Sequence, residues 1–246
     1  MTGPIRLDVF SDYLCPWCYN AAVRLADVQQ AYGDRVKLHW HAFPLIPDQR
    51  PGRLSTEATR ASRQKIGAEE PRALFVPPGV GTELPASSLP ALTAAKAAEG
   101  QGPDAGAAFH LSLFRAHFRD NLDIGRPDVL WRLGEACGLD MARFQRDCAG
   151  GEPHRAVLHD YAEAVAWFGV SALPTVVFNE RVSLVGAVPL EQYGLIIDWM
   201  LAGKPGGLIP LDFSDLATRA AGQSPVGEEP AWSVDVRTAR ESEHQG

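Results

Sequence analysis

Two cysteines separated by two residues form the most reactive pattern in this sequence. Cys15 and Cys18 enclose Pro16 and Trp17, directly after the apolar run at residues 5–10. If that run is a strand that leads into a helix, Cys15 lies where unpaired backbone N–H groups and the positive end of the helix dipole favour a thiolate. A thiolate is the attacking species in disulfide exchange, and proline suits a first helical turn. The spacing therefore predicts a redox-active dithiol that forms a reversible disulfide.

The same pair could instead be half of a zinc site or two buried structural thiols. Structural zinc takes four ligands, usually with a second closely spaced Cys or His pair. Cys137 and Cys148 have ten residues between them, and the seven histidines show no ligand spacing. Pro-Trp between the cysteines also suits the start of a helix. We therefore favour the dithiol, and expect no metal and no cofactor.

Composition narrows the class of protein and its partners. The chain has 246 residues, 46% of them hydrophobic, which is enough for one large domain or a domain with an insertion. A formal charge of −7 argues against nucleic-acid and anionic-membrane partners. No apolar run approaches the ~20 residues of a membrane span, and the first residues lack the features of a signal peptide. These patterns predict a cytoplasmic protein, in which a cysteine pair is catalytic or sensing rather than structural.

Hydrophobic periodicity predicts an interrupted α/β fold. A strand at 5–10, a helix at 17–32 and a strand at 36–43 form a βαβ unit. No convincing strand occurs in the middle of the chain, and strands at 175–178 and 182–185 precede a last helix at 189–201. The helices expected in the middle are 56–66, 89–99, 103–119, 126–137, 140–148 and 152–168, with an extended loop at 67–90. This order predicts a thioredoxin-like fold, βαβ…ββα, with an all-helical insertion.

The same order suggests domain limits. We expect a discontinuous thioredoxin-like domain at 1–50 and 157–205, and a helical insertion at 51–156. Residues 206–246 form a C-terminal extension that we expect to be partly disordered. Within it, residues 232–236 could dock as a short extended segment on this chain or on a neighbour, although an unordered terminus is favoured.

Three sequence stretches together resemble a known family. They are Asp-Tyr-Leu-Cys-Pro-Trp-Cys-Tyr at 12–19, Phe-Pro-Leu at 43–45 and Gly-Val-Ser-Ala-Leu-Pro-Thr-Val-Val-Phe at 169–178. The combination resembles the DsbA family of thioredoxin-like dithiol oxidoreductases, and its FrnE-like branch in particular. Gly-Ala-Val-Pro at 186–189 is also similar to that branch. The likeness extends over residues 5–201.

The resemblance implies roles for individual residues. Cys15 would be an exposed nucleophile of low pKa, and Cys18 would resolve the mixed disulfide. Pro174 would be a cis proline that faces the dithiol, and the backbone of Leu173 would pair with an extended substrate segment. The residues expected to bind substrate or tune the dithiol are Pro16, Trp17, Leu173 and Pro174.

Three functions remain open at this point. The first is a thiol-disulfide oxidoreductase or isomerase that exchanges disulfides with protein substrates. The second is a reductase or isomerase of small molecules that depends on a low-molecular-weight thiol such as glutathione or mycothiol. The third is a non-catalytic holdase or binding module. The dithiol favours the first. Cys137 and Cys148, on either side of a predicted helical hairpin, are expected to be buried and unbonded to each other.

Overall fold

A computed structural model describes residues 3–203 and 233–236 of the chain, and its centre is a mixed sheet with strand order β2-β1-β3-β4-β5. Strand β1 (Ile5–Ser11) runs parallel to β2 (Val36–Ala42) and antiparallel to β3 (Thr175–Phe178). Strand β4 (Val182–Val185) follows β3 through a tight hairpin. The α/β thioredoxin-like fold predicted from the order of elements is confirmed.

The hairpin between β3 and β4 is turned by two residues with left-handed backbone, which is common for asparagine and uncommon for glutamate. Asn179 and Glu180 both have positive φ angles, 45° and 59°. Positive φ at both central residues gives a turn whose twist matches that of the flanking strands. The side chain of Asn179 also accepts a hydrogen bond of 2.8 Å from the backbone N–H of Arg6 on β1. One short turn thus joins two strands and holds them against a third.

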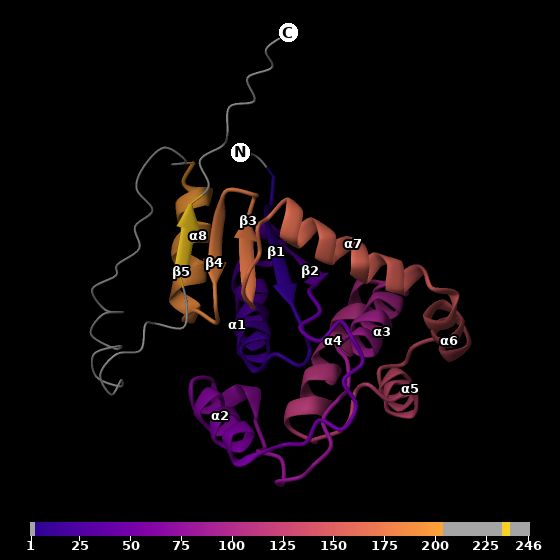
Figure 1. The fold of residues 1–246 in the computed structure, drawn as a ribbon. Helices are drawn as coiled ribbons and strands as arrows, with labels where there is room; N and C mark the ends of the chain where they lie inside the picture. The colour runs from indigo at the N-terminus through magenta and orange to yellow at the C-terminus, as the bar shows by residue number, and fades with distance from the viewer. Residues whose placement is uncertain (1–2, 204–232, 237–246) are drawn as a thin grey trace.

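Helices cover both faces of the sheet (Figure 1). Alternation along β1 directs Leu7 and Val9 toward α1 (Pro16–Tyr32) and α8 (Leu190–Leu201), whereas Phe10 packs with Phe168 beside α7 (Glu152–Ala166). These side chains are buried, as expected for a strand that is covered on both sides. Val9 and Phe10, near the end of β1, therefore pack into the hydrophobic layers on opposite faces of the sheet, close to the dithiol in the sequence.

All the segments between β2 and β3 are helices or loops. Helix α2 (Glu57–Ala68) is followed by a short 3-10 helix, η2 (Pro71–Ala73). The remaining helices before α7 are α3 (Leu89–Glu99), α4 (Pro103–Phe118), α5 (Pro127–Ala136) and α6 (Met141–Gly150). The helices agree with the prediction to within about two residues at each end. The expected extended loop at 67–90 is wrong in detail, because it contains the end of α2, η2 and Glu83, which forms an isolated β-bridge with Leu54.

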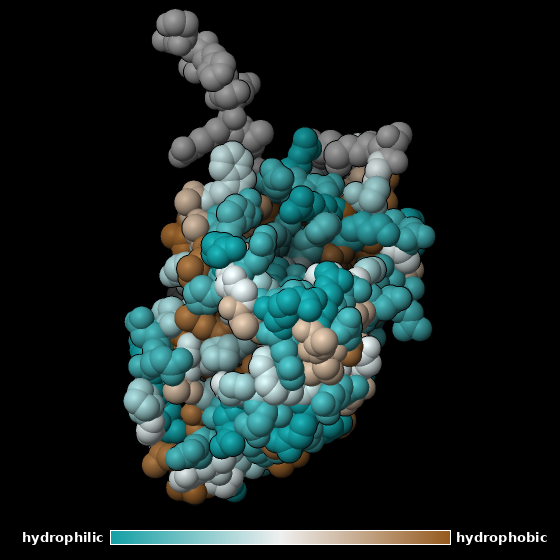
Figure 2. All heavy atoms as spheres, turned by 90° about the vertical axis from the view of Figure 1, so that its right-hand side faces the viewer, coloured by the Kyte–Doolittle hydropathy of each residue, from teal (hydrophilic) through white to brown (hydrophobic). Residues whose placement is uncertain are grey.

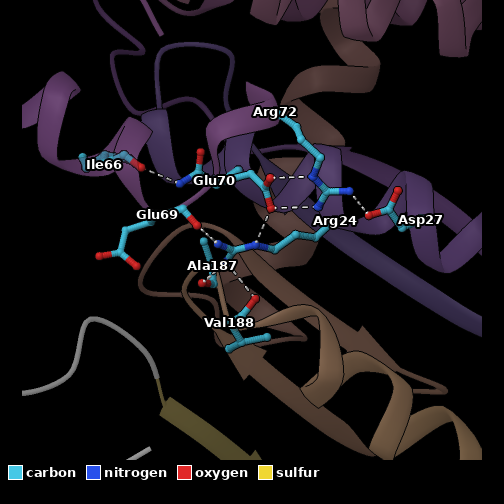
Figure 3. Close-up of polar contacts among 9 residues, drawn as sticks. Arg24, Asp27, Ile66, Glu69, Glu70, Arg72, Ala187 and Val188 are labelled. Atoms are coloured by element: carbon cyan, nitrogen blue, oxygen red, sulfur yellow. Dashed lines mark hydrogen bonds and ion pairs between the residues drawn. The ribbon is translucent and has the colours of Figure 1, made fainter. Parts of the chain in front are cut away.

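A buried arginine attaches this helical part to the sheet (Figure 3). Arg24 on α1 is 7% exposed and donates to the Glu70 carboxylate at 3.1 Å. It also donates to the backbone carbonyl of Glu69 at 2.7 Å and to those of Ala187 and Val188 at 2.7 and 2.9 Å. One side chain therefore connects α1, the segment after α2 and the loop before α8.

A second polar network lies between β2, α3 and α7. His41 Nε2 lies 2.8 Å from Asp8 Oδ1, and His41 Nδ1 lies 3.5 Å from Asp160 Oδ1. Lys96 donates to Asp160 and to the backbone carbonyl of Trp40, each at 2.9 Å. Burial alone would lower the pKa of His41, but its contacts with Asp160 and Asp8 outweigh burial and raise that pKa to about 9. His41 therefore belongs to a hydrogen-bonded face of β2.

The C-terminal prediction needs one correction. Residues 233–236 form strand β5 (Ser233–Val236), which pairs antiparallel with β4. A docked extended segment thus forms in place of the unordered one that we favoured, because the outer edge of β4 offers free backbone groups for pairing. The rest of the predicted partly disordered extension, except these four residues, lies outside the described part of the chain.

The face of the molecule on which α7 lies is mostly hydrophilic, with scattered apolar residues (Figure 2). Two aromatic residues, Tyr161 and Trp167, are 38% and 68% exposed. Among the described residues, no helix combines the length and apolar character needed to cross a bilayer.

Candidate functional site

Cys15 occupies the position immediately before the first helical residue of α1. It is the N-cap residue, with an extended backbone, and Pro16 is the first residue of the helix. The carbonyl oxygen of Cys15 accepts the N–H groups of Cys18 and Tyr19 at 3.1 and 3.4 Å. The predicted strand-to-helix placement is therefore correct, and the helix begins one residue earlier than expected.

The predicted exposure of Cys15 is wrong. Only 5% of the residue is accessible to solvent. The segment before β3 lies against it, since the carbonyl oxygen of Leu173 is 4.0 Å from the Cys15 sulfur. Leu14, Trp17 and Leu173 are partly buried residues packed against the cluster that contains Cys15. The Cys15 thiol is thus covered by the segment before β3 and does not lie on an open surface.

Cys18 lies deeper than Cys15. It is fully buried, and both cysteines are free thiols in this structure. Burial raises the pKa of Cys18 well above its ordinary value, and the neighbouring Cys15 raises it further. A buried thiol of this kind stays protonated until its surroundings change. The two sulfurs are therefore chemically unequal although they are one helical turn apart.

The loop before β3 approaches the dithiol from a distant part of the sequence. The Leu173–Pro174 peptide bond is cis, as the resemblance implied. The carbonyl of Pro174 accepts the N–H of Gly186 at 2.7 Å, and the Thr175 hydroxyl donates to the carbonyl of Ala172 at 2.8 Å. These bonds fix the loop from both sides, and the fold brings Cys15, Cys18 and Leu173 together.

The other two residues expected to contact substrate border the same place. Pro16 and Trp17 are half-buried, and Trp17 packs beside Leu14 on the cluster around the cysteines. Their positions follow from the first turn of α1, whose outer side carries them.

Asp12 holds the turn that delivers Cys15, and sequence reasoning missed this role. Its carboxylate accepts the N–H groups of Leu14 and Leu45 at 2.6 Å each, and its carbonyl accepts that of Cys15 at 3.1 Å. Asp12 is completely buried, and burial raises its pKa. The signal was present in the sequence, because an aspartate that accepts from the residue two positions later forms an Asx turn.

Tyr13 and His110 join the dithiol region to α4, and this pair was also missed. The Tyr13 hydroxyl and His110 Nδ1 are 2.9 Å apart. Burial lowers the pKa of His110 to about 3, so the ring is neutral. Tyr13 and His110 therefore share one hydrogen bond whose direction is set by the tautomer of the neutral ring, and His110 Nε2 is buried without a partner. No spacing in the sequence connects residues that are 97 positions apart.

The second cysteine pair is less buried than expected. Cys137 ends α5, Cys148 lies in α6, and both are half-buried free thiols. Burial, together with the charge of Asp147, raises the pKa of Cys148 to about 11. A high pKa reduces the thiolate fraction at neutral pH, so Cys148 has little nucleophilic character there.

The arrangement fits a known family. Residues 6–197 match the family described as DSBA-like thioredoxin domain. This chain belongs to that family. Its members are thiol-disulfide oxidoreductases, and the predicted DsbA-type fold is thereby confirmed. The FrnE-like branch is not distinguished by this match.

Relatives of known sequence have varied names. The chain is 28% identical over 216 residues to the ClpXP adapter protein SpxH of Halalkalibacterium halodurans, a match that covers 82% of this chain and 69% of that protein. It is 27% identical over 186 residues to the uncharacterized protein YwbO of Bacillus subtilis, with 72% and 88% coverage.

Solved structures share the fold at low sequence identity. A putative protein disulfide isomerase from Nitrosomonas europaea superposes with a TM-score of 0.67 and 18% identity, over 81% of this chain and 98% of that one. A probable DsbA oxidoreductase from Streptomyces coelicolor gives 0.67 and 21%, over 85% and 94%. The cytosolic disulfide reductase DsbM from Pseudomonas aeruginosa with GSH gives 0.56 and 23%, over 87% and 99%.

Proposed function

We propose that the protein exchanges disulfides with protein substrates through Cys15 and Cys18. The observation that carries this proposal is the meeting of three features: Cys15 at the N-cap of α1, buried Cys18 behind it, and the Leu173 carbonyl 4.0 Å from the Cys15 sulfur. A helix N-terminus favours an anion at its first turn, whereas the interior favours a neutral thiol. The two cysteines are thus suited to attack and to resolution, respectively.

In the reducing direction, the Cys15 thiolate attacks one sulfur of a substrate disulfide. A Cys15–substrate disulfide forms and the other substrate sulfur leaves as a thiolate. Cys18 then loses its proton and attacks the Cys15 sulfur, which releases the second substrate thiolate and leaves a Cys15–Cys18 disulfide. The substrate gains two electrons and two protons, and an external thiol must restore the dithiol. In the oxidising direction the same steps run in reverse.

The segment before β3 would hold the substrate. The backbone of Leu173 lies at the entrance of β3, beside the reacting sulfur, where an extended peptide could add its own hydrogen bonds. Such a peptide would contact Pro16, Trp17 and Pro174, which border the sulfur. Because Cys15 is 5% exposed, the substrate must displace part of this contact before its disulfide can reach the sulfur.

Trapping experiments test this proposal. Cys18→Ser should accumulate a mixed disulfide between Cys15 and a model disulfide protein, whereas Cys15→Ser should form none and lose turnover. The reduction potential of the pair separates the directions: a value near or below about −230 mV indicates a reductase or isomerase, and one near −120 mV an oxidant. If no Cys15–Cys18 disulfide forms at any glutathione ratio, the proposal is wrong.

A second candidate is disulfide exchange that uses a low-molecular-weight thiol. The support is the structural likeness to the Pseudomonas aeruginosa disulfide reductase crystallised with GSH. In this version, glutathione forms a mixed disulfide with Cys15. Saturable turnover with glutathione, together with a Cys15–glutathione adduct in the Cys18→Ser variant, would support it. The cytoplasm, as the reducing compartment that supplies such a thiol, remains our proposed location.

A third candidate is a binding role of the kind named in the relatives called ClpXP adapters. An adapter works by holding a partner, so its binding would not need the dithiol. A partner interaction that survives Cys15→Ser would favour this candidate over catalysis.

A further inference from the structure

We propose that His41, Asp160 and Glu163 form a binding site for a divalent transition-metal ion of the Mn²⁺ or Zn²⁺ class, at the contact between β2 and α7. A nitrogen of His41 and one carboxylate oxygen from each acid lie within 4.8 Å of one another. Imidazole and carboxylate ligands together suit ions of this class. The site uses none of the residues of the dithiol and does not depend on the proposed redox function.

His41 Nδ1 and Asp160 Oδ1 form a long ion pair when His41 is protonated, at a separation that also suits two ligands of one ion. His41 Nδ1 is buried without a hydrogen-bond partner, and it lies 3.5 Å from Asp160 Oδ1. That is too long for an N–H···O hydrogen bond. Two ligands of one tetrahedral ion, each ~2.1 Å from the metal, are ~3.4 Å apart. The gap therefore matches the spacing of two ligands that share an ion.

The other atoms of both residues are already held in place. His41 Nε2 donates to Asp8 at 2.8 Å, which leaves Nδ1 as the ligand atom. Asp160 Oδ2 accepts from the backbone N–H of Ala42 at 2.8 Å and from Lys96 at 2.9 Å, whereas Oδ1 faces His41 Nδ1. Carboxylates and backbone groups that fix the far side of a ligand in this way are characteristic of metal sites.

Glu163 completes the site from the same helix as Asp160. The two acids are three residues apart on α7, so their side chains share one face. Glu163 is half-buried and makes no hydrogen bond or ion pair among the described residues that involves its carboxylate, so it can turn toward the ion. Its partial exposure also provides an entry path from solvent.

Charge in the neighbourhood accommodates a dication. The acids that face the site are Asp8, Asp160, Glu163 and Glu99, and the fixed cations are Arg6 and Lys96. These six groups leave an excess of two negative charges when His41 is neutral. A bound dication cancels that excess, and it takes the place of the proton on His41 Nδ1, which leaves to solvent.

The site can be tested by titrating the full chain with Mn²⁺ alone and monitoring the EPR signal of free Mn²⁺, which is lost when the ion binds. Mn²⁺ avoids the thiols because it prefers oxygen ligands. We expect one ion per chain, displaced by Zn²⁺. Glu163→Gln should weaken binding by at least ~10-fold. Asp8→Asn should weaken it by ~10–100-fold, because the Asp8 carboxylate, which also pairs with Arg6, holds the far side of the His41 ring.

Glu152→Gln is the matched control, because Glu152 is on the same helix and its side chain is 90% exposed. It should change the affinity by less than about twofold, within the range of surface substitutions. Free Mn²⁺ throughout a titration of the wild-type protein, or equal losses in the Glu163 and Glu152 variants, would overturn the assignment. Since the Glu163 variant replaces a half-buried side chain, its fold can be checked by circular dichroism. Cys15→Ser with Cys18→Ser should bind Mn²⁺ as the wild type does, which separates this site from the dithiol.

Discussion

The Arg24 guanidinium and the Glu70 carboxylate form a buried ion pair at 3.1 Å, with 9% and 7% of their side chains exposed. Glu70 also receives Arg72, whose side chain is 52% exposed. The two arginines therefore bind one carboxylate from opposite environments, one inside and one at the surface. The contribution of the buried arginine, Arg24, to the free energy of unfolding can therefore be compared with that of the exposed Arg72 at the same carboxylate.

Arg24→Met should lower the free energy of unfolding by about 3 kcal/mol, because a buried acid loses a partner and three backbone carbonyls, all at least partly buried, lose their donor. Arg72→Met should cost no more than about 1 kcal/mol, since half-exposed ion pairs contribute little. Urea denaturation of both variants measures the difference. Equal losses would mean that burial does not govern the value of the Arg24 contacts.

Because His110 stays neutral in the folded protein, the free energy of unfolding should depend on pH in the acidic range. In the folded protein the pKa of His110 is about 3, as a result of burial, whereas an unfolded histidine titrates near ~6.5. The unfolded chain therefore binds one more proton between these values, and stability falls as the pH drops below about 6.5. Each such histidine contributes a slope of ~1.4 kcal/mol per pH unit.

His110→Gln should reduce that slope by about 1.4 kcal/mol per pH unit between about pH 4 and 6. Leu113→Ala is the control, since it removes a fully buried side chain from the same helix without removing a titratable group. It should lower stability at every pH and leave the slope unchanged. Denaturant titrations at several pH values test both variants. An unchanged slope in the Gln variant would contradict the burial of a neutral ring.

The buried Cys18 thiol should make the reduced protein less stable in alkali. Burial raises the pKa of Cys18 in the folded state, whereas an unfolded cysteine ionises near ~8.5. Above that pH the unfolded chain loses a proton that the folded chain keeps, so stability declines by up to ~1.4 kcal/mol per pH unit. The decline should be smaller in Cys18→Ala by up to that amount, and the part that remains comes from Cys148, whose pKa burial raises to about 11. Thermal unfolding of the reduced proteins between about pH 8 and 10 measures it.

Trp17 supplies no positive charge beside Cys15, and a histidine at that position would. Trp17→His should therefore stabilise the thiolate form and raise the reduction potential by tens of millivolts, where ~30 mV corresponds to a tenfold change in the equilibrium constant. Trp17→Phe keeps an uncharged aromatic ring and should remain close to the wild type. Equilibration with glutathione buffers measures all three proteins, and equal shifts in the two variants would show that packing rather than charge sets the potential.

Much of this architecture could be predicted because local signals and global topology agree. Pro16 and the cysteine spacing marked the start of α1, and Pro174 marked the entrance of β3. The order of elements then sufficed for the thioredoxin-like fold. The family resemblance placed Leu173 and Pro174 opposite the dithiol, but the burial of Cys15 could not be predicted, because it depends on how closely a segment 158 positions away packs on the sulfur. The Tyr13–His110 contact was invisible for the same reason, since it depends on how α4 packs rather than on any repeat in the sequence.

The histidine of β2 illustrates a different limit. Alternation along the strand placed His41 on one face of the sheet, but not the acids that would meet it there. Asp8 comes from the neighbouring strand and Asp160 from a helix formed by residues more than a hundred positions later. Strand periodicity specifies the face of a side chain, whereas its partners across the layer depend on tertiary packing.

Strand β5 has a consequence for how copies of this protein meet one another. An uncovered outermost strand presents a row of unpaired N–H and C=O groups that can recruit a strand from another molecule. The pairing of Val234 with Leu184 and of Val236 with Val182 occupies that row on β4 with the chain's own backbone. A chain truncated before Ser233 would leave these backbone groups of β4 unpaired. We expect the shortened protein to aggregate edge to edge through β4.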